Sequence, residues 1–176
     1  SRGQLYVGEF GSGLLIARDQ GQVLSRYGNV GNQAGSTGQA LVTGAGTRWD
    51  IDFDLFVGTS GTGELRIENG ALVASNYAIV ALDSTGRGTV VVTGVGSAWR
   101  NASDITIGDS GAGVLQVLDA GLVQSATALL GAFAGGTGDA IVAGQGALWE
   151  TQALTVGVGG SGRVQLRDGG RIVVRG

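Results

Sequence analysis

The sequence predicts an all-β fold, a parallel β-helix of about seven coils, and three observations support this prediction. First, the chain repeats itself every 50 residues, as solenoids, propellers and other repeat arrays do. Second, glycine returns at fixed places in each repeat, where turns need a backbone conformation that other residues avoid. Third, no stretch of twelve or more residues carries the 3.6-residue apolar period of a helix. The repeat is marked by Gly8, Gly58 and Gly108, by Gly38, Gly88 and Gly138, and by Trp49, Trp99 and Trp149.

The repeat divides the chain into three complete units and one partial unit, at residues 5–54, 55–104, 105–153 and 154–176. Each unit carries the same sub-pattern twice: an apolar residue and a small residue, a short linker, and an alternating strand. The two halves are 23 and 27 residues long, each about one coil of a parallel β-helix. We therefore expect residues 1–176 to form a single solenoid fragment. Because the repeat is cut at both ends, we expect this fragment to belong to a longer chain.

Strands and turns follow in a regular order within the unit at 55–104. An apolar strand at 55–58 is followed by the run 64–68, in which apolar and charged residues alternate, as in a strand with one buried face. An Asx-Gly turn comes next at Asn69-Gly70, with Asp19, Asp119 and Asp168 at matching places. The strand at 88–93 leads into Gly94-Val95-Gly96, where we expect positive φ. The recurring apolar positions predict a core of Val57, Leu65, Ile67, Val73, Val90 and Val92.

A β-propeller is the alternative architecture. It would need about four antiparallel strands in each blade of ~45 residues, and the Gly-rich linkers could supply the hairpin turns. Three and a half blades would not close a ring, whereas an open solenoid can stop at any coil. The parallel β-helix is therefore favoured.

Composition excludes several classes of chemistry. The chain has no Cys and no His, so it can build neither a Ser-His-Asp triad, nor a Cys-His pair, nor a Cys/His zinc site. We expect no cofactor. The formal net charge of -3 argues against nucleic acid as a partner. No apolar run reaches the length of a membrane span, and no signal-like segment is present.

The motif of the repeat resembles a known family. Residues 55–70 and 88–99, from Leu55-Phe56-Val57-Gly58 to Gly96-Ser97-Ala98-Trp99, are similar to the repeat of type V secretion autotransporter passenger domains. The resemblance extends over the whole chain. It implies a right-handed parallel β-helix, carried to the bacterial surface by a C-terminal barrel that this chain lacks and that would be its only link to a membrane. It also implies adhesion to host or bacterial surface molecules, or aggregation.

Three carboxylates alternate directly after the first tryptophan, at Asp50, Asp52 and Asp54. On an extended strand they would lie on one face about 7 Å apart, as a candidate site for a hard cation such as Ca²⁺. The other units do not keep the three carboxylates, and the oxygen count that calcium needs is not evident. A solvated acidic loop is therefore the favoured interpretation, with no metal bound.

The last fourteen residues hold four arginines against one acid: Arg163, Arg167, Arg171 and Arg175. Such a row could hold an anionic glycan or a lipopolysaccharide phosphate, or it could be an ordinary solvated face. The tryptophan series could be a sugar-stacking platform. Its regular place beside Gly-x-Gly favours packing at a corner instead, because a solenoid reuses the same buried slot.

An apolar stripe is predicted on the outside of the helix. If Val90 and Val92 point inward, then Leu41, Val91 and Ile141 point outward, one in every second coil. This stripe would be an association face, unless loops cover it or the two strand faces are assigned in the wrong sense.

Three functions fit the sequence. The leading hypothesis is a structural and adhesive segment of a surface-exposed passenger, which acts as a rigid stalk and is not an enzyme. It would be exported to the cell surface, with self-association as a further role. The alternative is a glycan-binding module that uses Trp or Arg faces. A polysaccharide-active enzyme is the least favoured, because acids such as Asp50, Asp52, Glu64 and Glu68 lie in no predicted cleft.

Overall fold

The computed structural model describes residues 2–176 and contains strands, turns and bends but no helix in that range. None of the described residues therefore form a helix long and apolar enough to cross a membrane. The strands are β1 (Gln4–Val7), β2 (Ser12–Ala17), β3 (Gln22–Ser25), β4 (Tyr27–Val30), β5 (Thr37–Thr43), β6 (Arg48–Ile51), β7 (Asp54–Val57), β8 (Thr62–Glu68), β9 (Leu72–Ser75), β10 (Tyr77–Val80), β11 (Arg87–Thr93), β12 (Ala98–Asn101), β13 (Ile105–Ile107), β14 (Ala112–Leu118), β15 (Leu122–Leu130), β16 (Thr137–Ala143), β17 (Leu148–Val156), β18 (Ser161–Arg167) and β19 (Arg171–Val174).

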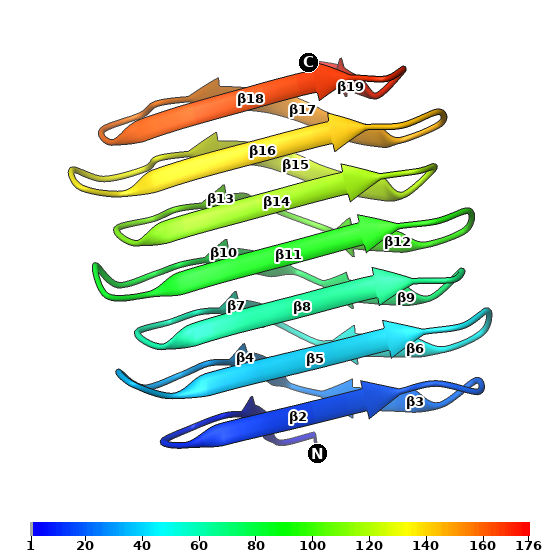
Figure 1. The fold of residues 1–176 in the computed structure, drawn as a ribbon, viewed down its shortest axis with the longest axis vertical. Coiled ribbons are helices and arrows are strands. Elements are labelled where there is room, and N and C mark those ends of the chain that lie inside the picture. The colour runs from blue at the N-terminus through cyan, green and yellow to red at the C-terminus, as the bar shows by residue number, and fades with distance from the viewer. Residues whose placement is uncertain (1) are drawn as a thin grey trace.

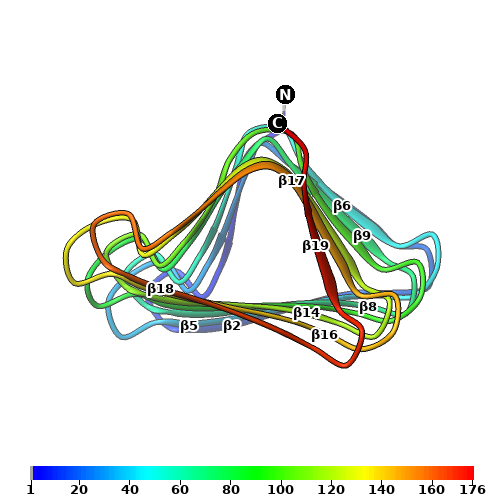
Figure 2. The ribbon, with the colours of Figure 1, turned by 90° about the horizontal axis from the view of Figure 1, so that it is seen from above.

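The chain winds as a parallel β-solenoid of about seven turns with a triangular cross-section (Figures 1 and 2). One side of the triangle is a seven-stranded sheet in the order β18-β16-β14-β11-β8-β5-β2. A twelve-stranded sheet forms the other two sides, and its long strands β15 and β17 run round the apex between them. The strand pairs are parallel, which confirms the predicted fold class. The propeller alternative, which needs antiparallel hairpins, is wrong.

The inside of each coil is filled by one of two combinations of side chains. Coils that carry a tryptophan place Gly28, Ala78 or Ala128 on another side of the triangle, whereas the coils between them place Leu55 or Ile105 there. The tryptophans share one inward column with smaller residues. Along the solenoid this column holds Val23, Trp49, Val73, Trp99, Val123, Trp149 and Ile172. A Cβ at Gly28 would lie 2.7 Å from Trp49 Cζ2. The sequence therefore repeats every two coils because a large residue on one side requires a small one on another.

The predicted core is confirmed. Val57, Leu65, Ile67, Val73, Val90 and Val92 are all buried, together with the equivalent positions of the other central coils. Val90 and Val92 occupy the same inward columns as Ala40 and Val42, and as Ala140 and Val142. The assignment of strand faces made from the repeat was therefore right.

Positive φ occurs at the predicted turns. Gly94 and Gly96 have φ of 91° and 80°, and Asp19, Asn69, Asp119 and Asp168 all lie in the left-handed region. At another corner the backbones of neighbouring segments touch: a Cβ at Gly58 would lie 2.2 Å from the Arg87 carbonyl oxygen. Glycine stands in this column in every coil except one, where Ala81 adopts φ of 63°.

Replacing Ala81 by glycine should stabilise the protein. A non-glycine residue in the left-handed region costs roughly 1–2 kcal/mol, and the added freedom of glycine in the unfolded chain offsets about 0.4–1 kcal/mol of the gain. We expect Ala81→Gly to raise the free energy of unfolding by about 0.5–1 kcal/mol, measured by urea denaturation. Ala74→Gly, in the ordinary strand β9, is the control and should lower it. A less stable Ala81→Gly protein would contradict the strain argument.

Candidate functional site: the flat face

The outward side of the seven-stranded sheet, which we call the flat face, is the candidate site. It is the straight base of the triangle in Figure 2. Because side chains alternate along each strand, every coil adds two residues to its centre. One outward column holds Ile16, Leu41, Arg66, Val91, Gln116, Ile141 and Gln165, and its neighbour holds Leu14, Gln39, Glu64, Thr89, Val114, Asp139 and Arg163.

The three residues of the predicted apolar stripe do point outward on this face. They are not contiguous, however, because Arg66 and Gln116 alternate with them in the same column. Val91 lies between these two long side chains and is only 5 % exposed. The sequence pattern therefore placed Leu41, Val91 and Ile141 on the correct side but overstated the continuity of the apolar surface.

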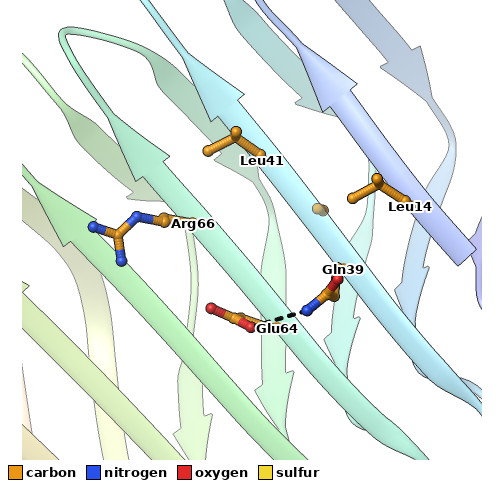
Figure 3. Close-up of a pocket in the computed structure, with 6 residues that line it drawn as sticks. Leu14, Gln39, Leu41, Glu64 and Arg66 are labelled. Atoms are coloured by element: carbon orange, nitrogen blue, oxygen red, sulfur yellow. Dashed lines mark hydrogen bonds between the residues drawn. The ribbon is translucent and has the colours of Figure 1, made fainter.

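The exposed apolar surface is greatest at the N-terminal end of the flat face. Leu14 is 66 % and Ile16 52 % exposed on β2, and Leu41 lies beside Ile16 on β5. Leu14, Leu41 and Ala40 line a shallow hollow of about 160 Å³, closed on the other side by Gln39, Glu64 and Arg66 (Figure 3). The sequence prediction missed Leu14 and Ile16, although their alternation with the inward Leu15 and Ala17 was a usable signal.

A charged row on β8 borders this hollow. Arg66 Nε donates to Glu68 Oε2 at 2.6 Å, and Gln39 Nε2 donates to Glu64 Oε2 at 3.5 Å, as the dashed line in Figure 3 shows. These pairs are exposed, so each contributes little to stability. They do give the hollow a polar rim, and an apolar area with a polar rim is typical of a binding surface.

The four C-terminal arginines lie on two sides of the coil instead of one. Arg163 and Arg167 belong to β18 in the seven-stranded sheet, whereas Arg171 begins β19 on another side and Arg175 follows it. Arg163 pairs with Asp139 at 3.0 Å and Arg175 with Glu150 at 3.2 Å. The single anionic-ligand face that the sequence suggested is therefore divided by the turn between β18 and β19.

Asp50, Asp52 and Asp54 do not lie on one extended strand. Strand β6 ends at Ile51 and β7 begins at Asp54, so the chain bends at residues 52 and 53. Arg48 pairs with Asp50 at 2.7 Å, and Arg2 pairs with Asp52. Within residues 2–176, no group of three His, Cys, Asp or Glu side chains could hold a metal ion.

The tryptophans are not a sugar platform. Trp49, Trp99 and Trp149 are fully buried, and Trp49 Nε1 donates to Ser25 Oγ at 3.0 Å inside the core. Their packing role is confirmed. The aromatic rings that do reach the surface near the apex are Phe53 and Tyr77, which the sequence pattern did not single out.

The carboxyl group of Asp109 has a shifted pKa. It lies at the corner where the glycine column of Gly58 and Gly108 has Ala81 in one coil. Burial raises the pKa of Asp109 above its ordinary value, the Ser110 hydroxyl opposes the rise, and repulsion from Asp83 adds to it. Asp109 and Asp83 come close because consecutive coils stack at this corner, where the Asp109 amide donates to the Ala81 carbonyl. The ionised side chain of Asp109 is thus less favourable in the folded state than in the unfolded state.

Comparisons with known proteins identify no relative. No family model matches the chain, and neither a curated protein nor a solved structure matches it. The parallel β-solenoid is shown by the strand pairing itself.

Removing the charge of Asp109 should stabilise the protein at neutral pH. A carboxyl whose folded-state pKa is raised costs stability above that pKa, and the cost disappears as both states become protonated in acid. We expect Asp109→Asn to raise the free energy of unfolding by less than about 1 kcal/mol at neutral pH, since the group is half-exposed. The gain should vanish below the ordinary Asp pKa of about 3.9.

Urea denaturation at the two pH values measures this difference. Asp168→Asn is the matched control, because Asp168 is exposed and Asn also accepts its left-handed φ. A gain that is equal at both pH values, or a loss at neutral pH, would show that charge is not the cause.

Proposed function

We propose that this chain is a rigid, adhesive segment of a bacterial surface-exposed passenger protein of the autotransporter type. The passenger is secreted to the cell surface and anchored in the outer membrane. The segment acts as a stalk and binds host or bacterial surface molecules, including other copies of itself, through the flat face. The observation that carries the proposal is the exposed pair Leu14 and Ile16, with the half-buried Leu41 beside them, on an otherwise regular, seven-stranded sheet.

The stalk role is supported by the uninterrupted stacking of coils. Each coil pairs with the next through strands on all three sides, and the ladder continues through the corners, where Ser60 donates its amide to the Asn32 carbonyl and Ser110 to that of Leu82. At the spacing of about 4.8 Å between strands, seven coils give a rod of about 34 Å. Such a rod holds its outward residues at fixed distances, as a repeated binding surface needs.

The adhesive role is supported by the character of the flat face. Isolated exposed apolar residues are common, but Leu14 and Ile16 lie together beside a hollow with a polar rim. One such contact is weak. Many copies on two cell surfaces would act together, because each contact formed raises the effective concentration for the next.

The flat face should make the isolated chain self-associate. We expect weak, concentration-dependent association in sedimentation velocity, which Leu14→Glu combined with Ile16→Lys should weaken by about tenfold or more, since burying each of these side chains contributes about 1.5–3 kcal/mol. This pair of changes leaves the net charge unaltered. Phe133→Glu with Val95→Lys is the matched control, because both residues are exposed at corner turns away from the flat face.

The same variants test adhesion on cells. The chain would be displayed on bacteria by fusion to an outer-membrane anchor, and settling of the culture would be followed. Settling that depends on Leu14 and Ile16 but not on Phe133 and Val95 supports the proposal. If all variants are displayed in equal amounts and settle at the same rate, the flat face does not cause adhesion and the segment is only a spacer.

A further inference from the structure

Two of the three tyrosines lie near the apex of the triangle, together with Phe53. Tyr27 and Tyr77 occupy one outward column, whereas Tyr6 lies two residues further along its strand, in register with Asn29. Phe53 and Tyr77 are 42 % and 37 % exposed, and Tyr27 is half-buried. We call Tyr27, Phe53 and Tyr77 the aromatic edge. They come from β4, the bend before β7, and β10. Stacking of the coils brings them together on the outside, although the sequence spaces them 26 and 24 residues apart.

The rings form two platforms. Tyr27 and Phe53 stack with ring centroids 5.4 Å apart and an interplanar angle of 20°, and the Arg26 guanidinium lies 5.7 Å and 5.2 Å from the two centroids. The register of β4, β7 and β10 places Tyr77 two strands beyond Tyr27, which is about 9.6 Å along the solenoid. That distance is comparable to the length of an extended disaccharide.

Hydrogen-bonding groups surround these platforms. Asp54 pairs in register with Tyr77 on the strand between the two tyrosines, and Tyr77 Oη donates to Asp104 Oδ2 at 2.6 Å. At Asp52, the residue before Phe53, the surface sinks into a hollow of about 310 Å³, whose polar lining is Asp50, Asp52, Ser75 and Asn76. Flat apolar rings thus stand next to several oxygen and amide groups.

The charges favour an uncharged ligand. Arg48 pairs with Asp50, Arg2 pairs with Asp52, and Arg26 lies beside the two rings of the first platform. Asp54 and Asp104 would repel a polyanion, whereas the three arginines would repel a polycation. A neutral molecule that has both apolar faces and hydroxyl groups is repelled by neither set of charges.

We propose that the aromatic edge binds a neutral oligosaccharide. One pyranose ring stacks on the Tyr27–Phe53 platform and another on Tyr77, while hydroxyl groups donate to Asp54 and Asp104 and reach the polar hollow. This site lies on different sides of the coil from the flat face, so it is independent of the self-association proposed above.

The C-terminal half of the chain provides an internal comparison. A hollow of about 260 Å³ lies on the same side of the solenoid there, lined by Gln124, Ser125, Glu150, Thr151, Gln152 and Arg175. Fifty residues after Phe53 and Tyr77, the chain has Ser103 and Thr127. The hollow is kept and the rings are lost, so this end of the solenoid should not bind the saccharide. The same comparison supplies substitutions that the coil already accepts.

The test uses the whole chain and a series of neutral linear oligosaccharides of increasing length, with binding measured by calorimetry. We expect affinity to rise from monosaccharide to disaccharide and longer chains. Tyr77→Thr and Phe53→Ser should each weaken it by about two- to tenfold, the range for one aromatic contact. Phe133→Ala, which removes an exposed ring at a distant corner, should leave it unchanged.

Thermal melts of the same samples establish that each variant is folded. The proposal is overturned if no neutral oligosaccharide binds. It is also overturned if folded Tyr77→Thr and Phe53→Ser proteins bind as the unmodified chain does, or if only a polyanion or a cationic peptide binds.

Discussion

Every coil of this solenoid must enclose the same volume as the coils above and below it, and the rest of the structure depends on that constraint. Parallel hydrogen bonds hold neighbouring strands at one spacing on all three sides, so a coil can neither widen nor narrow alone. The chain meets the constraint in two ways, with Trp49 against Gly28 in one coil and Val73 against Leu55 in the next. Alternation of these two solutions produces the 50-residue repeat.

The constraint acts only on inward side chains. Outward positions are free to differ from coil to coil, and it is there that the repeat breaks. The flat face carries Leu14 and Ile16 at one end and Asp139 with Arg163 at the other. In the aromatic edge, Tyr27 and Tyr77 are followed by Thr127 at the same position of the next unit. A uniform core therefore supports a surface whose two proposed binding areas both lie in its N-terminal half.

The fold could be predicted from the sequence because the repeat records the inward constraint directly. Val90 and Val92, the Gly94 and Gly96 turns and the seven coils follow from position in the period alone. The surface sites could not be predicted in this way. A bend at residues 52 and 53 separates Asp50 from Asp54, and stacking of coils brings Tyr27 to Phe53. The spacing of the repeated residues reveals neither the bend nor the contact between these two rings.

A double-mutant cycle at Gly28 and Trp49 tests the volume constraint most directly. Trp49→Val alone leaves a cavity, at a cost of about 3–5 kcal/mol, and Gly28→Leu alone overfills the coil, at a cost of about 1–3 kcal/mol or more. Together they give the combination of Leu55 and Val73 in the next coil. The account predicts that the double variant loses less stability in urea denaturation than the sum of the two, by more than about 1 kcal/mol. Losses that simply add would contradict it.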